Sequence, residues 1–159
     1  MQRKHHQYHE FHKTLQQQSS LEETLVDVSN TLKKMLTVQR ASVLLYDNKA
    51  KQFWTKIANH DEKIVVPYDQ GIVGESYRTG KVQLENEPYD NPNFFAEIDM
   101  QLGFYTQNIL AAPLFNTKEE IIGVLELINK PDGFTKEDRE LISYFTDTIS
   151  SVVAKHLSE

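Results

Sequence analysis

The chain contains no cysteine, which excludes disulfide frameworks, thiol catalysis, thiolate metal sites and cofactors attached through sulfur. It has only 6 Gly and 5 Pro, too few for a collagen-like or low-complexity chain. It lacks both the apolar run of a secretory signal at its start and any stretch approaching the ~18–20 apolar residues of a membrane span. It also lacks a basic excess: 17 Lys and Arg against 23 Asp and Glu give a net charge of −6. We therefore expect a cytoplasmic protein without a nucleic-acid or membrane partner.

What is present suits one globular domain, since 159 residues with 39% hydrophobic and 25% charged residues are typical of that class. The first 18 residues differ, because they are rich in Gln and His. We interpret residues 1–19 as a helical linker or flexible N-terminal segment and residues 20–159 as the domain. His5 and His9 lie one helical turn apart, so a metal site is the alternative there. With only His ligands and no enclosing residues, we predict no metal site.

Two amphipathic helices are predicted at the ends of the domain. Ser20 and Glu23 form a capping box before apolar residues at spacings of three and four, up to Met35. Thr135 and Asp138 open a second helix whose apolar stripe continues to Leu157. The sequence alone does not decide between docking on the domain's own sheet and pairing with a second chain. Because we expect one sheet face to be too small for both stripes, we predict a homodimer joined by the terminal helices.

Between these helices, short apolar segments separated by turn residues indicate strands over residues 41–46, 52–57, 63–66, 82–84, 109–115 and 121–128. The last of these is almost continuously apolar, so it should be a central strand, whereas Pro67 places the third near a sheet edge. Short helices are predicted over residues 71–80 and 94–102, and residues 85–93 are predicted to be loop. The predicted fold class is α+β, an antiparallel sheet flanked by helices.

Several spaced motifs resemble the GAF sensory domain. They are Gln70-Gly-Ile-Val-Gly74, Arg78-Thr-Gly80, Gly103-Phe-Tyr-Thr106, Asn108-Ile-Leu110 with Pro113, and Ile122-Gly-Val124 with Asn129-Lys130. The resemblance covers about residues 20–157. It implies a six-stranded antiparallel sheet with the N- and C-terminal helices packed on one face, as in GAF and PAS-like folds. A small-molecule pocket would lie on the other face, under residues 67–106.

One further motif is similar to the GAF domains of cyclic-nucleotide phosphodiesterases and cyanobacterial-type adenylyl cyclases. Asn129, Lys130, Phe134 and Asp138 match it, while Arg139 replaces the expected Glu. The resemblance implies a salt bridge between Lys130 and Asp138 beneath the pocket. Asp138 also has a local explanation, because an acidic residue in the first turn of a helix is favourable in any protein.

The same resemblance implies which residues would hold a cyclic nucleotide, either cAMP or cGMP. The matching side chains are Ser42, Asp99, Thr106 and Glu126, with the backbone of Ile72 and Val73. Ala58 stands where the family has the aromatic residue that stacks on the base, and Leu102 stands where it has a Thr. Tyr46, Trp54 or Phe104 would have to supply the missing aromatic ring. Glu126 has two interpretations, a pocket residue or a solvent-facing one.

We predict no enzymatic activity. The absence of cysteine excludes bilin attachment and the thiol-dependent reduction of methionine sulfoxide. The only mid-domain candidate for a haem ligand is His60, which we interpret as part of an exposed loop. Motifs of hydrolases and metalloproteases, such as GxSxG and HExxH, are missing. The resemblance implies a regulatory sensor domain that binds a small molecule and relays the signal through dimerising terminal helices to an output domain. The alternative is a GAF scaffold that dimerises and transmits without a ligand.

Overall fold

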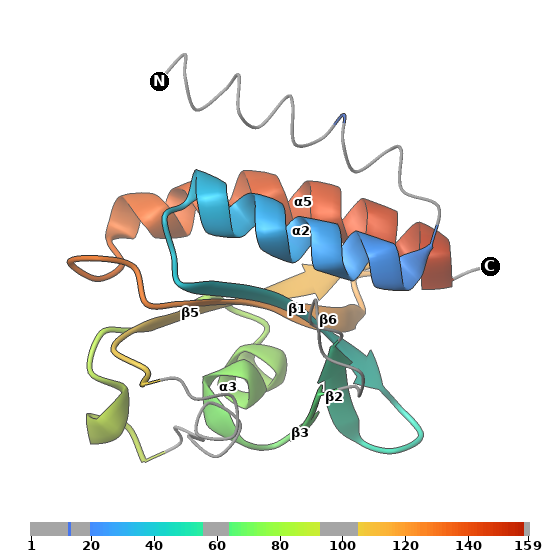
Figure 1. The fold of residues 1–159 in the computed structure, drawn as a ribbon. Coiled ribbons are helices and arrows are strands. Elements are labelled where there is room, and N and C mark those ends of the chain that lie inside the picture. The colour runs from blue at the N-terminus through green and yellow to red at the C-terminus, as the bar shows by residue number, and fades with distance from the viewer. Residues whose placement is uncertain (1–12, 14–19, 56–63, 93–104, 158–159) are drawn as a thin grey trace.

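The computed structural model describes Lys13 and residues 20–55, 64–92 and 105–157, which form a sheet with helices on both of its faces. The helices α2 (Leu21–Met35) and α5 (Lys136–Leu157) lie side by side on one face, and α3 (Gly71–Thr79) lies on the other (Figure 1). Among the described helices, none has the length and apolar character needed to cross a membrane.

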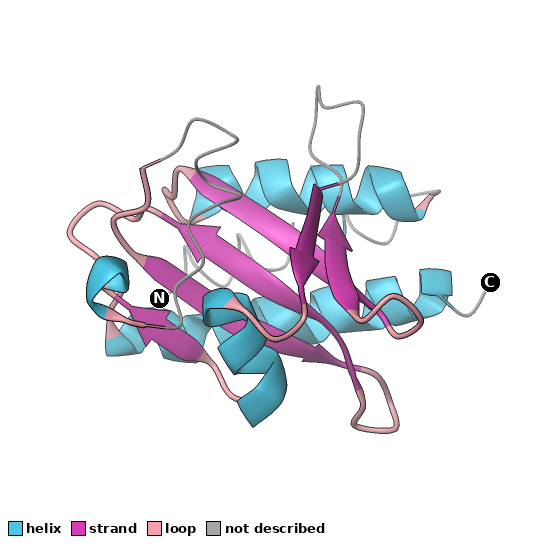
Figure 2. Ribbon diagram, turned by 90° about the horizontal axis from the view of Figure 1, so that it is seen from below, coloured by secondary structure: helices cyan, strands magenta, loops and turns pink. Residues whose placement is uncertain are grey.

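The sheet has six antiparallel strands in the order β3-β2-β1-β6-β5-β4 (Figure 2). The predicted fold class, α+β with a six-stranded antiparallel sheet and both terminal helices on one face, is therefore confirmed. The strands are β1 (Arg40–Asp47), β2 (Gln52–Thr55), β3 (Ile64–Pro67), β4 (Gln83–Glu85), β5 (Ile109–Phe115) and β6 (Ile121–Ile128).

The positions of two strands follow from their composition, as predicted. β6 pairs with β1 on one side and with β5 on the other, which confirms that the most continuously apolar segment is central. β3 forms one edge of the sheet and ends at Pro67, a residue that cannot donate a backbone hydrogen bond to a further strand.

The helix ends use the predicted capping residues. The Ser20 hydroxyl accepts a hydrogen bond from the Glu23 N–H at 3.1 Å, at the start of α2. Before α5, the Thr135 hydroxyl accepts from the Asp138 N–H at 3.2 Å, and the Asp138 carboxylate accepts from the Thr135 N–H at 2.8 Å. Gly80 ends α3 with a φ of 68°, a left-handed conformation that costs glycine little.

Each sheet face has its own apolar cluster, because successive strand residues point to opposite sides. On the helix-covered face, Val43 and Leu125 belong to the cluster that includes α2 and α5. On the opposite face, Leu44, Val124 and Ile128 pack with Ile72 and Val73 of α3. The second cluster therefore marks the face on which the resemblance places a ligand.

One expectation about the terminal helices is wrong. The sheet covers the apolar stripes of both α2 and α5, since Leu25, Leu32, Phe145 and Ile149 are each no more than 2% exposed. α5 retains a large exposed apolar side chain at its end, Leu157 at 49%. The two helices lie next to each other across a twisted sheet, so one face accommodates both apolar stripes. Uncovered stripes therefore give no reason to expect a dimer.

Other segments differ from the prediction or lie outside the described residues. The predicted loop over residues 85–93 contains a turn of 3₁₀ helix, η1 (Pro88–Asp90), which begins at a proline as such turns often do. The helix predicted over residues 94–102, the end of the second predicted strand and the linker over residues 1–19, apart from Lys13, lie outside the described residues.

Candidate functional site

Ser42 and Glu126 lie directly opposite each other on adjacent strands. They are Cα partners in the register of β1 and β6, and both belong to the sheet face that carries α3. Ser42 is 5% exposed and the Glu126 side chain is 13% exposed. Of the two interpretations of Glu126, solvent-facing is therefore wrong, and the carboxylate belongs to the covered face.

Arg40 is a third polar residue on this face, and the sequence analysis did not identify it. Its Nη2 lies 3.2 Å from Oε1 of Glu126, and the Arg40 side chain is only 10% exposed. Arg40 and Ser42 are two residues apart on one strand, so they point to the same side. That spacing could have indicated that Arg40 shares a sheet face with Ser42. A single Arg before an apolar segment is equally typical of a solvent-exposed strand end.

These residues give this sheet face charged groups of both hydrogen-bonding polarities. The guanidinium group of Arg40 offers only donors, the carboxylate of Glu126 only acceptors, and the Ser42 hydroxyl either. At low local dielectric such groups interact strongly with a polar ligand. The arrangement can therefore recognise a planar group that carries both donors and acceptors.

Ile72 and Val73 lie at the start of α3 and belong to the same apolar cluster as Leu44. They are 2% and 3% exposed. Gly74 follows because α3 runs close to the preceding chain: a Cβ at this position would be 3.0 Å from the carbonyl oxygen of Tyr68. This close approach explains the second glycine of the Gly-Ile-Val-Gly motif.

Thr106 lies apart from this row of polar residues. It is fully buried just before β5, and it lines a cavity of about 490 Å³ together with Tyr89 and Tyr105. Asp99, the remaining predicted ligand residue, lies outside the described residues, as do Ala58, His60, Leu102 and Phe104. Within the part of the chain that the structure describes, three or more His, Asp or Glu side chains do not gather as a metal site.

Of the aromatic residues considered as replacements for a stacking ring, Tyr46 and Trp54 are described. The Tyr46 ring stacks on Tyr77, with centroids 4.6 Å apart, and contacts the edge of Phe53 at 5.6 Å. Burial and then the hydrogen bond with Tyr46 raise the pKa of Tyr77 to about 12, so its hydroxyl stays protonated at neutral pH. Trp54 packs against the helix-side cluster, on the wrong face for a ligand beside Glu126.

Asn129 joins the end of β6 to the segment before β5. Its φ is 63°, a left-handed conformation that Asn tolerates better than most residues. Its Oδ1 accepts from the Gln107 N–H at 2.6 Å, and its Nδ2 donates to the Tyr105 carbonyl at 2.8 Å. Asn108 forms a similar link to the next residue, because its Oδ1 accepts from the Lys130 N–H at 2.8 Å. The Asn-Lys pair thus fixes the turn beneath Thr106.

Lys130 and Asp138 connect this turn to the first turn of α5. Lys130 Nζ lies 2.6 Å from Asp138 Oδ2, and the two side chains are 27% and 18% exposed. Burial raises the pKa of the Asp138 carboxyl, but the hydrogen bonds from Lys130 and Thr135 outweigh it, and the pKa lies below its usual value. Phe134, which lies between Lys130 and Asp138 in the sequence, is buried, and its N–H donates to Oδ1 of Asn86 at 2.9 Å.

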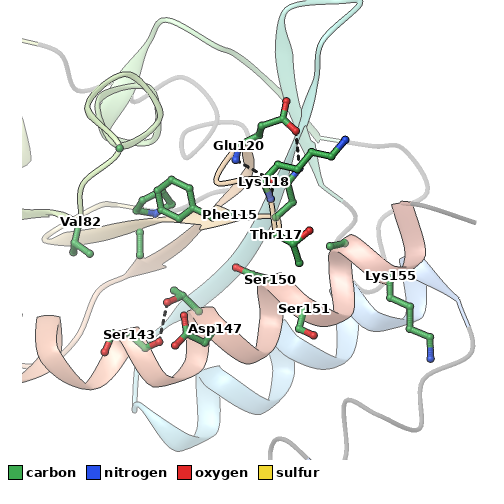
Figure 3. Close-up of a pocket in the computed structure, with 16 residues that line it drawn as sticks. Val82, Phe115, Thr117, Lys118, Glu120, Ser143, Asp147, Ser150, Ser151 and Lys155 are labelled. Atoms are coloured by element: carbon green, nitrogen blue, oxygen red, sulfur yellow. Dashed lines mark hydrogen bonds between the residues drawn. The ribbon is translucent and has the colours of Figure 1, made fainter.

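A separate groove of about 850 Å³ lies at the opposite side of the sheet (Figure 3). Asp147 and Ser150 of α5 lie across from Phe115 and Thr117, where β5 ends and the turn to β6 begins. None of the predicted ligand residues lines this groove within the described part of the chain.

The buried ion pair gives a stability prediction. Glu126→Ala leaves the Arg40 guanidinium buried without its carboxylate, and we expect it to lower the free energy of unfolding by about 3 kcal/mol in urea denaturation. Arg40→Met combined with Glu126→Leu should recover most of this loss, since similar apolar volumes replace both charges. A double variant as unstable as the sum of the single variants Arg40→Met and Glu126→Leu would contradict a direct interaction between the two residues.

The Lys130–Asp138 pair gives a pH prediction. Asp138→Ala should cost about 1 kcal/mol at pH 7 because it removes a capping acceptor and a partly shielded ion pair. A cycle with Lys130→Ala should show coupling of about 0.5 kcal/mol or more.

The pKa of Asp138 is lower in the folded state than in the unfolded chain. The contribution of Asp138 is therefore full above the unfolded value of about 3.9, and it is lost as the pH falls through the lowered folded value. Coupling that is absent at pH 7, or that does not decrease once the pH falls below the folded-state pKa of Asp138 as titrated by NMR, would contradict an ion pair.

The chain was compared with known proteins and structures. It is 29% identical over 142 residues to a probable 3',5'-cyclic phosphodiesterase, pde-5, of Caenorhabditis elegans; the alignment covers 79% of this chain and 19% of that protein. The chain thus spans about a fifth of that relative's length.

Two solved structures share the fold. The GAF domain of an Acinetobacter phosphoenolpyruvate-protein phosphotransferase has a TM-score of 0.82 at 15% identity, covering 98% of this chain and 95% of that one. Free methionine-R-sulfoxide reductase of Neisseria meningitidis, in complex with its substrate, has a TM-score of 0.79 at 13% identity, covering 95% and 88%. The family model for the GAF domain matches residues 18–154, so the chain belongs to the GAF domain family, a family of regulatory and sensor domains.

Proposed function

We propose that this GAF domain binds a small molecule on the α3 face of its sheet and acts as a sensor. The observation that carries the proposal is the pair formed by Arg40 and Glu126, at 10% and 13% exposure, beside the buried Ser42. Burying two charges costs more free energy than burying two apolar side chains of the same size. Such a pair on a packed face, at the start of β1 and near the end of β6, is better explained by recognition than by stability.

The proposed ligand class is a purine cyclic nucleotide, cAMP or cGMP. A purine edge carries adjacent donors and acceptors, which complement the carboxylate of Glu126 and the guanidinium of Arg40. The Gln70 side chain makes no capping hydrogen bond at the start of α3, where backbone N–H groups favour an anion such as a cyclic phosphate. The similarity to a probable cyclic phosphodiesterase points to the same ligand class. Thr106 and Asp99 are the further contacts that the proposal includes.

We propose that the domain itself is not an enzyme. One structural neighbour is a methionine sulfoxide reductase, but at 13% identity the likeness concerns the fold alone. That chemistry uses cysteine thiols in GAF enzymes, and this chain has none. The proposed output is conformational, passed along α2 and α5 to an output domain of the full-length protein.

We also propose that the domain dimerises through its terminal helices, by their outer faces. α5 exposes Tyr144 at 54% on the side away from its buried stripe, and it exposes Leu157 at 49% at the C-terminal end of that stripe. Light scattering after gel filtration at tens of micromolar should give twice the chain mass of 18.5 kDa. Tyr144→Glu with Leu157→Glu should shift the mass toward the monomer, whereas Tyr89→Glu, a matched exposed tyrosine far from α5 in sequence, should not. A monomeric wild type would contradict this proposal.

The ligand proposal predicts stabilisation by cyclic nucleotides. At a hundredfold excess over the dissociation constant, cAMP or cGMP should stabilise the fold by about 2.7 kcal/mol, a melting shift of several degrees. Ser42→Ala and Glu126→Gln should each weaken binding in calorimetry by about tenfold, the loss of one buried hydrogen bond. Ser150→Ala is the matched control, because Ser150 is a buried serine on α5, on the other side of the sheet.

The result that contradicts the proposal is an unchanged melting temperature at millimolar cAMP and cGMP, with no heat of binding. A scaffold that dimerises and transmits without a ligand would then explain the domain better. Equal weakening by Ser42→Ala and Ser150→Ala would place the nucleotide away from the Arg40–Glu126 row.

A further inference from the structure

Two exposed tyrosines stack on each other beside the cavity that contains Thr106. The ring centroids of Tyr89 and Tyr105 are 5.3 Å apart with an interplanar angle of 22°. Their exposed fractions are 55% and 68%, so the pair buries little apolar surface and contributes little to the core. Both rings line a cavity of about 490 Å³.

The backbone that carries each ring is fixed by hydrogen bonds. The Tyr105 carbonyl accepts from Nδ2 of Asn129 at 2.8 Å. Tyr89 lies in η1, where the carboxylate of Glu85 accepts from the Glu87 N–H at 3.1 Å and from Nδ2 of Asn91 at 2.9 Å. The backbone beneath both rings is therefore fixed and the rings stack on each other before any ligand arrives, which lowers the entropic cost of binding.

The charge around the cavity is negative. Among the described residues that line it, Glu87 and Asp132 carry carboxylates, and Lys and Arg are absent. The ammonium group of Lys130, two residues before Asp132, is in contact with Asp138. The amides of Asn86 and Asn108 are already used, in pairs of hydrogen bonds with Phe134 and Lys130. Negative charge and the uncovered surfaces of the stacked rings, beside Thr106 and Gln107, are thus what the cavity offers a ligand.

A cation satisfies both features. The faces of aromatic rings carry a negative quadrupole that attracts cations, and recognition of quaternary ammonium groups by aromatic residues uses this attraction. The carboxylates of Glu87 and Asp132 attract a cation electrostatically, and this attraction does not require a hydrogen-bond donor on the ligand. An alkali cation would prefer oxygen ligands to ring faces, and an anion would be repelled.

We propose that the cavity bounded by Tyr89, Tyr105, Glu87 and Asp132 binds a compact organic cation of the quaternary ammonium class. The site is separate from the Arg40–Glu126 row, where a guanidinium group is part of the recognition surface. The inference does not depend on the proposed function, although Thr106 lines this cavity and is also one of the residues predicted for a nucleotide.

The test compares choline with 3,3-dimethylbutan-1-ol, a neutral molecule of nearly the same shape, at constant ionic strength set with sodium chloride. Amide and aromatic NMR spectra of the full chain should show saturable shifts with choline at Tyr89, Tyr105 and their neighbours. The neutral molecule should bind at least about tenfold more weakly, because it loses the charge-dependent part of the interaction. Absence of choline shifts, or equal shifts from both molecules, would overturn the proposal.

Variants locate the site. Tyr89→Leu and Tyr105→Leu should each weaken choline binding by about fivefold or more, within the range of a cation–π contact. Tyr144→Leu, which removes a tyrosine of comparable exposure from α5, should leave it unchanged. Glu87→Gln with Asp132→Asn changes exposed residues only, so it should weaken binding while the fold remains intact. Unchanged choline binding in these cavity variants, or an equal loss in Tyr144→Leu, would contradict the assignment.

A parallel titration with cAMP and cGMP separates the two proposals. Choline binding without a nucleotide response supports the cation site and counts only against the proposed nucleotide site. A nucleotide response without choline binding supports the proposed nucleotide site and counts only against the cation site.

Discussion

The central strand β6 needs a partner for every polar group that it buries, because it is enclosed on all sides. It is paired with β1 and β5 on its two sides, and both of its faces are covered, by α2 and α5 on one and by the α3 cluster on the other. A charged residue at such a position is costly unless it has a partner. Glu126 has that partner in Arg40, on the neighbouring strand and the same face. The polar row with Ser42 therefore places a buried ion pair on the α3 face of the sheet.

The end of β6 links that face to the terminal helix. Ile128 is followed directly by the Asn129-Lys130 turn, whose side chains and backbone contact Tyr105, Gln107 and Asn108 before β5. Lys130 then reaches the first turn of α5 through Asp138. Glu126 is thus three residues from a turn tied to α5 by an ion pair. In the proposed sensor, a change at the polar row has a short covalent and hydrogen-bonded route to the helix that would carry the signal.

The sequence predicted the fold well because the signals are local. Capping residues at Ser20 and Thr135, Gly80 at the end of α3 and the apolar run of β6 each act through neighbouring residues. The coverage of the helix stripes was mispredicted, since the area of a twisted sheet face depends on long-range packing. Arg40 was missed for the same reason: its importance comes from Glu126, 86 residues away. The stacking of Tyr89 on Tyr105 likewise joins two separate loops and leaves no periodic signal in the sequence.

In the proposed sensor, the ligand contacts the α3 face and not the groove beside α5. Backbone amide NMR of the full chain, recorded with and without saturating cAMP or cGMP, tests it most directly. We expect chemical-shift changes at Arg40, Ser42 and Glu126 and at the start of α3, with smaller changes at Asn129 and Lys130. Changes confined to the groove lined by Asp147, Ser150 and Phe115, or spectra that do not change, would contradict it.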